Sequence, residues 1–397
     1  MAKELRVGIV GYNFMGKAHS NAWLRAGQFF DLPVGICLRA ACGRTAAKVE
    51  AFARNWGWET VETDYRRLVQ RDDIDLVDVC VPNNLHRDVA VAALKAGKAV
   101  ACEKPLAMNL RQAREMAALA ARQGAFTTVW YNYRRVPALC LARRLVREGR
   151  IGRVFHVRAN YLQSWIIDPN FPLVWRLDGA VAGSGSHGDL NAHIIDAVRF
   201  ITGEEITEVT ALMETFIKER PVLADFGAGL SAKASKGRTA PVTVDDAVVA
   251  LARLSGGGVA TFEATRFAQG YLNGNRIDIN GEKGSIRFNV ERMNELEYYD
   301  ASAAPHVRGW TTVYATDPVE HEYFGAWWPP GHIIGYEHTF VHQAADIARA
   351  FGEANPKSAD YDGRTKSVQP DFAEAARTQA VLEAMTKSAI THRWVKC

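Results

Sequence analysis

A carboxylate, an imidazole and an ammonium group in this 397-residue sequence have the types and spacing needed to move a proton. Asp189 and His193 are four positions apart, so on a helix they project from the same face. Histidine titrates near neutral pH and can accept the proton of a hydroxyl group. Lys104 follows an apolar strand, and its charge would stabilise a developing alkoxide. Because a lone helical histidine is often structural, this hypothesis depends on the elements that position these residues.

A glycine-rich turn after the first apolar strand predicts a phosphate-binding site. Gly11-Tyr12-Asn13-Phe14-Met15-Gly16 follows the strand expected at residues 5–10. It matches the dinucleotide fingerprint GxGxxG except that Asn13 stands at the second glycine, and asparagine is the non-glycine residue best tolerated at positive φ. The helix that follows offers N–H groups to a phosphate. We expect Gly11, Asn13, Phe14, Met15 and Gly16 to bind a cofactor.

The end of the second strand leaves the choice between NAD and NADP open. NAD enzymes usually carry Asp or Glu there, to bind the ribose hydroxyls. This strand ends instead in Cys42-Gly43-Arg44, with no acid. Arg44 could stack on adenine, accept a 2′-phosphate, or be an exposed residue at a helix start. We place Gly43 and Arg44 at the cofactor without choosing between the two nucleotides.

The first part of the chain alternates strands with helices, which predicts a doubly wound parallel sheet. Its ligands should lie at the carboxyl ends of the strands. We expect this α/β Rossmann domain to span residues 1–130. The segments concerned are strands at 5–10, 34–42, 74–81, 99–102 and 126–131, and helices at 16–26, 46–56, 89–96 and 110–123.

The rest of the chain has longer segments with partial alternation of apolar and polar residues. They predict an α+β domain over residues 131–397, with a large, mostly antiparallel open sheet. One sheet face would cover the substrate, and the other could pair with a second subunit. The stretch Phe226 to Pro241, rich in Gly, Ala, Ser and Lys, is expected to be a loop.

The composition is that of an ordinary globular protein, with 48% apolar and 23% charged residues. A net charge of +4 gives no argument for nucleic acid or a membrane surface. No apolar segment approaches the ~20 residues of a membrane span, and we expect a cytoplasmic protein. The six cysteines are scattered, without the CxxC pairs or Cys/His clusters of a metal site.

The sequence contains several further short motifs: Pro82-Asn83-Asn84-Leu85-His86, Glu103-Lys104-Pro105, Asn132-Tyr133-Arg134-Arg135, Trp175-Arg176, Ala182-Gly183-Ser184-Gly185, Gly188-Asp189, Glu263-Ala264-Thr265-Arg266 and Gly281-Glu282-Lys283-Gly284-Ser285. Together they resemble the motifs of the glucose–fructose oxidoreductase/inositol dehydrogenase (Gfo/Idh/MocA) family. Within that family the chain is most similar to the levoglucosan dehydrogenase-like sugar 3-dehydrogenases. Asn13, Asn84 and His187 depart from the expected pattern.

The resemblance implies an NAD-dependent oxidoreductase acting on a secondary alcohol of a sugar, at C3 of a pyranose, and a homodimer or homotetramer. Lys104, Asp189 and His193 would be catalytic. The sugar would be bound by these three together with Tyr133, Arg134 and His187. The cofactor would be bound by Pro82, Asn83, His86, Glu103, Lys104, Asn132, Trp175 and Arg176, of which the last three are also candidates for the sugar.

Two other functions use the same scaffold. In an NAD-dependent glycosidase, transient oxidation at C3 acidifies the C2 proton and allows elimination of the aglycone, and the hydride then returns. This needs a second base, for which Tyr133 or His187 is available. A nucleotide-binding regulator would be expected to have lost Lys104, Asp189 and His193. Metal catalysis is disfavoured because His187 and His193 lack a convincing third ligand.

Overall fold

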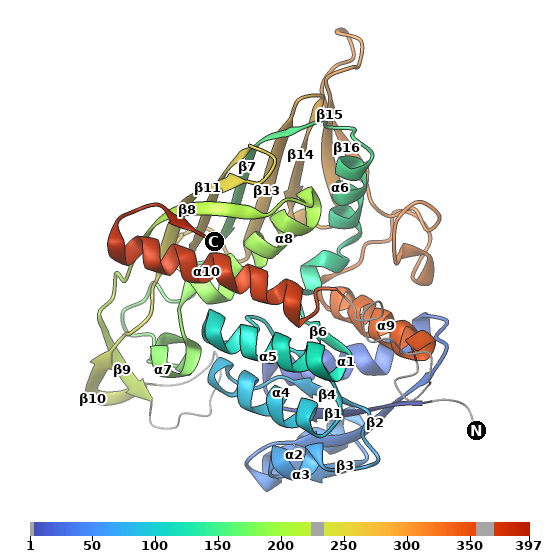
Figure 1. Cartoon of the computed structure of the whole chain (residues 1–397), viewed down its shortest axis with the longest axis vertical. Coiled ribbons are helices and arrows are strands. Elements are labelled where there is room, and N and C mark those ends of the chain that lie inside the picture. The colour runs from blue at the N-terminus through green and yellow to red at the C-terminus, as the bar shows by residue number, and fades with distance from the viewer. Residues whose placement is uncertain (1–3, 224–233, 355–368) are drawn as a thin grey trace. The chain divides into compact units, whose positions relative to one another are not determined.

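The computed structural model describes residues 4–223, 234–354 and 369–397, and the chain divides into two compact units (Figure 1). The first comprises Met1–Asn132 and Gly335–Arg377, and the second Tyr133–Ile334 and Thr378–Cys397. The chain thus first changes unit two residues after the expected boundary at 130. Residues 335–377, which the expected division into 1–130 and 131–397 groups with the second part, belong to the first unit. None of the described helices is long and apolar enough to cross a membrane.

The first unit contains the predicted parallel sheet, with strand order β3-β2-β1-β4-β5-β6. Every residue of β4 and β5 is buried, as in a strand covered on both faces. The continuous apolar runs in the sequence therefore indicated the right class of sheet. The strands are β1 (Glu4–Val10), β2 (Gly35–Cys42), β3 (Thr60–Glu62), β4 (Leu76–Val79), β5 (Ala99–Cys102) and β6 (Thr127–Val129).

Helices connect most of these strands, and some of them have recognisable capping residues. Helix α5, for example, begins after Asn109, whose side chain accepts the Gln112 N–H, and ends at Gly124 in the left-handed conformation. Helix α1 packs against α2 and α9, whereas α4 packs against α3 and α5. The bounds are α1 (Phe14–Phe29), α2 (Ala46–Trp56), α3 (Tyr65–Val69), α4 (His86–Lys95), α5 (Leu110–Gln123), α9 (Tyr336–Ala354) and the short η1 (Asn83–Leu85).

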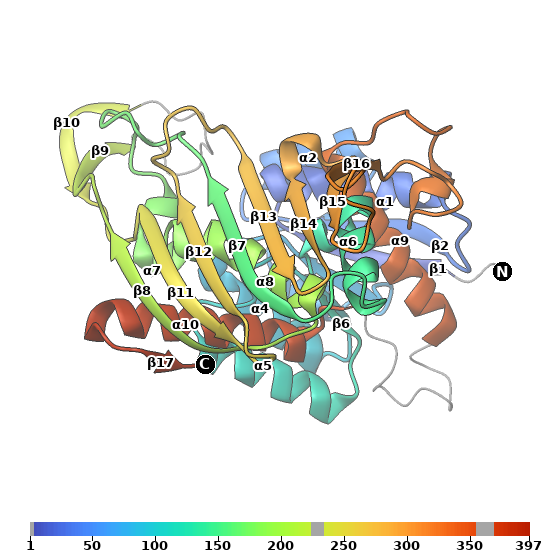
Figure 2. The same cartoon turned by 90° about the horizontal axis from the view of Figure 1, so that it is seen from above.

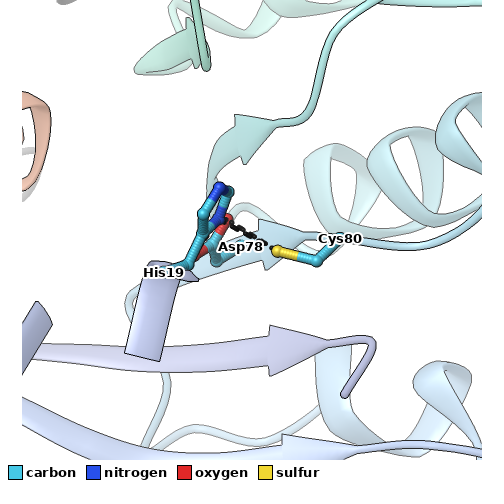
Figure 3. Close-up of side chains that lie close together, drawn as sticks. All are labelled: His19, Asp78 and Cys80. Atoms are coloured by element: carbon cyan, nitrogen blue, oxygen red, sulfur yellow. Dashed lines mark hydrogen bonds and ion pairs between the residues drawn. The ribbon is translucent and has the colours of Figure 1, made fainter. Parts of the chain in front are cut away.

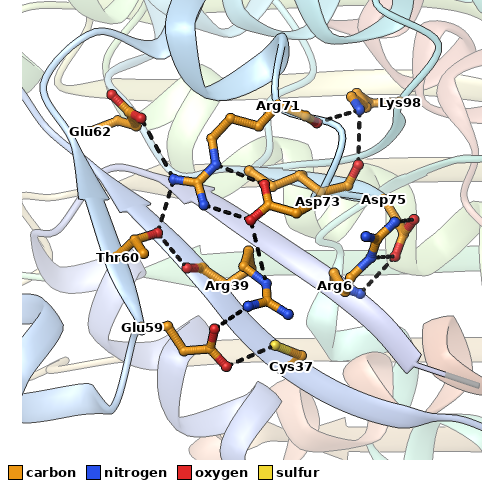
Figure 4. Close-up of polar contacts among 11 residues, drawn as sticks. Arg6, Cys37, Arg39, Glu59, Thr60, Glu62, Arg71, Asp73, Asp75 and Lys98 are labelled. Carbon is orange, nitrogen blue, oxygen red and sulfur yellow. Dashed lines mark hydrogen bonds and ion pairs between the residues drawn. The ribbon is translucent and has the colours of Figure 1, made fainter. Parts of the chain in front are cut away.

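A network of ion pairs joins the amino-terminal side of this sheet (Figure 4). Arg6 of β1 forms a pair with Asp75 at 2.7 Å, just before β4. The Arg71 guanidinium binds Asp73 and holds the pKa of that carboxyl below its usual range. The Lys98 ammonium donates to the Arg71 carbonyl at 2.7 Å. These charges lie away from the carboxyl ends of the strands, where a ligand would be expected to bind. They therefore link neighbouring strands without occupying those carboxyl ends, which are called the ligand edge below.

The second unit contains a nine-stranded sheet of order β16-β15-β14-β13-β7-β12-β11-β8-β17 (Figure 2). Only β7 and β12 pair in parallel, so the sheet is mostly antiparallel as expected. The strands are β7 (Val154–Leu162), β8 (Ile206–Glu214), β11 (Ala247–Leu254), β12 (Val259–Thr265), β13 (Gly274–Gly281), β14 (Gly284–Asn289), β15 (Glu295–Asp300), β16 (Trp310–Tyr314) and β17 (Val395–Lys396).

This sheet has one covered and one open face. In β11, Val248 and Ala250 are buried while Val249 and Leu251 are exposed, which is the alternation of a half-buried strand. Helix α6 contacts β14 and β15, and α8 contacts β7 and β13. The helices are α6 (Pro137–Arg147), α7 (Gly179–Ala182), α8 (Ala192–Thr202) and α10 (Phe372–Thr391), with short helices η2 (Asn132–Arg135), η3 (Trp175–Leu177), η4 (His187–Asn191), η5 (Val290–Arg292) and η6 (Phe324–Ala326).

A two-stranded ribbon of β9 (Glu219–Leu223) and β10 (Ala234–Pro241) corrects one expectation. The loop predicted over 226–241 is wrong for residues 234–241, and residues 226–233 lie outside the described part of the chain. The small and polar composition of this stretch resembles a loop. Pairing with β9 satisfies its backbone groups whatever its side chains are.

Candidate functional site

The turn between β1 and α1 is built for the close approach of a ligand. Gly11 has φ +116, and a Cβ there would lie 2.3 Å from the Cys80 carbonyl oxygen. A Cβ at Gly16 would lie 2.3 Å from the Gly11 carbonyl oxygen. Both positions therefore require glycine, as the fingerprint predicts, and the cradle that they leave fits a pyrophosphate.

Asn13 occupies its position for a different reason from the one expected. Its φ is −83 and its conformation extended, so no left-handed backbone selects asparagine. It is the N-cap of α1, but its side chain makes no capping hydrogen bond, and the first turn holds no acidic residue. Asn13 and Phe14 are exposed and Met15 is half-buried. The N-terminus of this 16-residue helix thus presents N–H groups suited to a phosphate.

Tyr12 covers the residue that follows β2, a contact that the sequence did not indicate. A Cβ at Gly43 would lie 2.1 Å from the Tyr12 ring, so glycine is what lets the ring lie there. The Gly43 N–H donates to the Glu62 carbonyl at 3.1 Å, while Arg44 is exposed. Tyr12, Gly43 and Arg44 line the end of β2, where an adenosine would be expected in this fold.

His86 holds two strand ends together. Its Nδ1 lies 2.9 Å from the Pro105 carbonyl and its Nε2 3.0 Å from the Val81 carbonyl, after β5 and β4 respectively. Burial lowers the pKa of His86, so the ring is neutral and donates to one carbonyl at a time. Both nitrogens face the protein, and this side chain shapes the turn at Pro82 and Asn83.

Glu103 is also held from within. One carboxylate oxygen lies 3.0 Å from Nε2 of His19, and the other accepts the backbone N–H of Lys104 at 3.1 Å. His19 is in turn bonded to Asp78 and lies beside Cys80 (Figure 3). Glu103 therefore binds both His19 and the backbone N–H of Lys104. His19 and Asp78 were missed by the sequence analysis, although an aspartate inside a buried strand is a detectable signal.

In the second unit, His193 lies among tyrosines. Its ring stands at 67° to that of Tyr133, with centroids 4.9 Å apart. The Tyr133 hydroxyl is 2.9 Å from that of Tyr161, which donates to Asn273 at 2.7 Å. Burial raises the pKa of Tyr133, so its phenol stays protonated at neutral pH. Tyr161 and Asn273 come from separate strand regions, and their alternating patterns carried no sign of this cluster.

Asp189 lies in the π-helical turn η4 that leads directly into α8. π-Helical turns within helices are frequent at functional sites. Arg266, fully buried and over the Trp165 ring, donates to the Asp189 carboxylate at 2.7 Å. This charge-assisted hydrogen bond orients the Asp189 carboxylate. Asp189 and His193 therefore lie one helical turn apart, as their spacing predicts.

Other predicted ligand-binding residues are held by neighbours within their own unit. His187 contacts the Leu382 carbonyl through Nε2 and the Asn191 amide through Nδ1, and burial lowers its pKa. Asn132 donates to Thr339 at 2.8 Å. Trp175 and Arg176 form a half-buried cation–π pair, at 4.4 Å.

Arg134 makes a buried ion pair with Asp196. Its Nε and Nη2 donate to the two carboxylate oxygens at 2.7 and 2.6 Å. Both side chains are nearly inaccessible to solvent. Such bidentate pairs are rigid, and this one joins the segment before α6 to α8. The geometry is that of a structural ion pair.

Comparison with known proteins agrees with this arrangement. Residues 5–131 match the model of the oxidoreductase family with an NAD-binding Rossmann fold, and residues 140–287 match the GFO/IDH/MocA C-terminal domain. The chain is 38% identical over 99% of its length to levoglucosan dehydrogenase of Pseudarthrobacter phenanthrenivorans, 98% of which is covered. The chain belongs to the Gfo/Idh/MocA oxidoreductase family.

Solved structures of family members extend the likeness to both units. An oxidoreductase domain protein from Kribbella flavida has a TM-score of 0.91 and 49% identity, with 99% of each chain covered. A levoglucosan dehydrogenase in complex with NADH and levoglucosan has a TM-score of 0.90 and 38% identity, again with 99% of each chain covered. The chain is an NAD-binding enzyme of this family, as the sequence motifs predict.

The glycine turn provides a first test. Gly11→Ala should weaken NADH binding and lower the thermal unfolding temperature, because the new Cβ would collide with backbone at Cys80. Gly27→Ala, in the helix α1 that follows this turn and with nothing within 4 Å of its Cβ, is the control and should bind NADH normally. Fluorescence titration with NADH measures the difference. Equal affinity in the two variants would contradict this role of Gly11.

The Arg134–Asp196 pair provides a second test. Asp196→Asn leaves the buried guanidinium without its counter-charge and should reduce the free energy of unfolding by about 3–5 kcal/mol. Urea unfolding followed by tryptophan fluorescence measures this loss. A variant that keeps its stability but has a raised KM for the substrate would instead place Arg134 in substrate binding.

Proposed function

We propose that this enzyme oxidises a secondary alcohol of a sugar, at C3 of a pyranose or pyranoside, with NAD as the acceptor. The observation that carries the proposal is the arrangement of Asp189 and His193 at the π-helical start of α8, beside Tyr133 and Tyr161. A similar protein is named for its action on levoglucosan, an anhydrosugar. Other family relatives are named D-apiose dehydrogenase and inositol 2-dehydrogenase, which supports a polyhydroxylated substrate.

The cofactor would be held by the first unit. The Gly11–Gly16 turn and the N-terminus of α1 would receive the pyrophosphate, and Tyr12, Gly43 and Arg44 would contact the adenosine. Pro82, Asn83 and the Glu103–Lys104 segment, at the ends of β4 and β5, would contact the nicotinamide half. Bound NAD supplies the acceptor for the hydride that leaves the alcohol carbon.

The proton of the alcohol would be handled by the protein. His193 would accept it as general base while the carbon loses hydride, and the products would be a ketone, NADH and a proton. The Lys104 ammonium donates a hydrogen bond to the reacting oxygen and stabilises its developing charge. Asp189, held by Arg266, accepts hydrogen bonds from a sugar hydroxyl and fixes its orientation. The Tyr133 hydroxyl would add a further hydrogen bond to the sugar.

The redox-neutral glycosidase needs a second base at C2, and two observations weigh against it. Both ring nitrogens of His187 are engaged by neighbours. Burial raises the pKa of Tyr133, so its phenolate is scarce at neutral pH. Net oxidation is therefore the proposal, and glycoside cleavage without NADH accumulation is the outcome that would replace it.

A panel of sugars, anhydrosugars, inositols and glycosides, each with NAD and with NADP, tests the function directly. NADH should accumulate with at least one pyranose, and its product should carry the ketone at C3 by NMR. His193→Ala should lower kcat by roughly 100-fold or more, since general-base catalysis contributes about 10²–10⁴-fold. Its NADH affinity should be retained. Unchanged turnover in His193→Ala would eliminate this residue as the base.

We also propose that the open face of the nine-stranded sheet pairs with a second copy of the chain. Leu212 and Val249 are neighbours in register, and Leu251 and Val259 lie on the same face, all at least 43% exposed. Such an exposed apolar surface is typical of an interface, and a two-fold pairing would bury it on both copies.

The buried, free thiols of Cys42, Cys80 and Cys102 suit a reducing, cytoplasmic location.

Light scattering in solution tests the assembly. The wild type should have a mass of two or four times 43.9 kDa, and the double variant Val249→Asp/Leu251→Asp should shift toward the monomer. Val319→Asp changes an apolar side chain that is 88% exposed in the segment between β16 and η6, outside the strands, and it should leave the mass unchanged. A monomeric wild type would refute the proposed pairing.

A further inference from the structure

A histidine with a carboxylate on each side is buried beneath the ligand edge of the first unit. Nδ1 of His19 lies 3.0 and 3.1 Å from the two oxygens of Asp78, and Nε2 lies 3.0 Å from an oxygen of Glu103. His19 and Asp78 have no solvent exposure, and Glu103 is 5% exposed. The three come from α1, the middle of β4 and the end of β5.

The geometry selects the protonation state of the ring. An ionised carboxylate only accepts hydrogen bonds, and a neutral imidazole has one N–H donor. A neutral His19 would therefore turn a nitrogen lone pair toward one of the carboxylates. An imidazolium donates to both. Burial opposes this charge, but Asp78 and Glu103 outweigh it and raise the pKa of His19 to about 9.

The remaining neighbours complete the hydrogen bonding of the group. The indoles of Trp23 and Trp130 donate to the two Asp78 oxygens at 2.7 and 2.9 Å. Trp130 also lies against the His19 ring, with centroids 4.0 Å apart, and Phe340 of α9 lies at 5.5 Å. Cys80 has its Sγ 3.0 Å from Nδ1, and burial raises the pKa of this thiol, which stays neutral.

These contacts are hydrogen bonds rather than the coordination sphere of a metal. Nδ1 of His19, an oxygen of Asp78 and Sγ of Cys80 do lie within 4.8 Å of one another. Each Asp78 oxygen, however, already accepts an indole N–H. A metal ligand set would also need a thiolate, whereas the carboxylates and burial disfavour ionisation of Cys80.

We propose that His19 is a positioning residue for Lys104. Its imidazolium holds the Glu103 carboxylate in the place where the second oxygen receives the Lys104 N–H at 3.1 Å. The direction in which the chain leaves β5, and hence the placement of the lysine side chain, depends on this contact. The proposal rests on the catalytic role proposed for Lys104.

Without the cation, Asp78 and Glu103 would be two carboxylates sharing a buried space. One would have to take up a proton or turn away, because burial of unpaired charge is costly. Asp78 is retained by the two indoles, so Glu103 is the group that moves. The Lys104 N–H would then lose its acceptor.

The direct experiment is hydrogen–deuterium exchange on the full-length chain carrying His19→Gln, a neutral side chain of similar reach. The peptide covering Lys104 should exchange faster than in the wild type, because its amide loses the bond to Glu103. Asp75→Asn is the matched control. It breaks the Arg6 pair at the amino-terminal side of the same sheet and should leave this peptide unchanged.

Stability against pH tests the charge of His19 without any reference to activity. A folded pKa of about 9, against 6.5 for the free side chain, gives stability that is fully present below pH 6.5 and lost as the pH rises toward 9. In this pH range the free energy of unfolding of His19→Gln should lack the pH dependence that corresponds to about one bound proton. Asp75→Asn should keep this dependence. An unaltered slope in His19→Gln would show that the ring is neutral and would overturn the proposal.

Kinetics separate a positioning role from a merely structural one. With a sugar that yields NADH, kcat of folded His19→Gln should fall by up to about 100-fold, the cost of a misplaced group, while NADH affinity changes far less. Unchanged kcat together with unchanged exchange at Lys104 would overturn the proposal, as would one equivalent of zinc in the purified protein that is absent from His19→Gln.

Lys104→Met distinguishes a failure of this proposal from a failure of the proposed function. If Lys104→Met keeps its turnover, the catalytic role proposed for the lysine is refuted. The exchange and pH experiments would still report on the contact between His19 and Glu103. If Lys104→Met is inactive while His19→Gln is fully active, the function stands and the positioning role is refuted.

Discussion

A single buried histidine joins the parts of the first unit on which the ligand edge depends. His19 projects from the second turn of α1 and meets Asp78 of β4 on one side and Glu103 at the end of β5 on the other. Through Asp78 the same group reaches Trp130, which follows β6. The helix that follows the glycine turn and the strands β4, β5 and β6 are therefore linked through this group.

The cost of burying these charges explains why so many neighbours contribute to them. Buried carboxylates are tolerated only when their oxygens receive donors. Two indoles, an imidazole and a backbone N–H provide them here. The amino-terminal side of the sheet carries charges too, but its ion pairs at Arg6 and Arg71 are partly exposed and individually weak. The charged groups at the amino-terminal side of the sheet are thus partly exposed to solvent, whereas those beneath the ligand edge are buried.

The second unit positions its polar residues by a different means. Asp189 and His193 are set by local chain geometry, a π-helical turn running into α8. Their neighbours Arg266, Tyr161 and Asn273 come from strands or strand ends. The pairing of β7 with β12 in parallel and with β13 antiparallel brings them together from distant parts of the sequence. Rigid strands supply the fixed frame, and the helix supplies the groups proposed to react.

The parallel sheet, the antiparallel sheet, the two glycines of the turn and the Asp189–His193 spacing follow from the sequence, because each depends on local periodicity or on one backbone position. Only the tertiary structure determined which polar residues form hydrogen bonds or ion pairs inside the protein. His86, His187 and Arg134 are predicted ligand-binding residues, and in the fold each also bonds a carbonyl or carboxylate group of the protein 19 to 195 positions away. His19 and Arg266, which no spacing marks, acquire their importance from partners 59 and 77 positions away. A buried polar side chain must be paired, and only the folded chain determines whether its partner is a ligand or another residue.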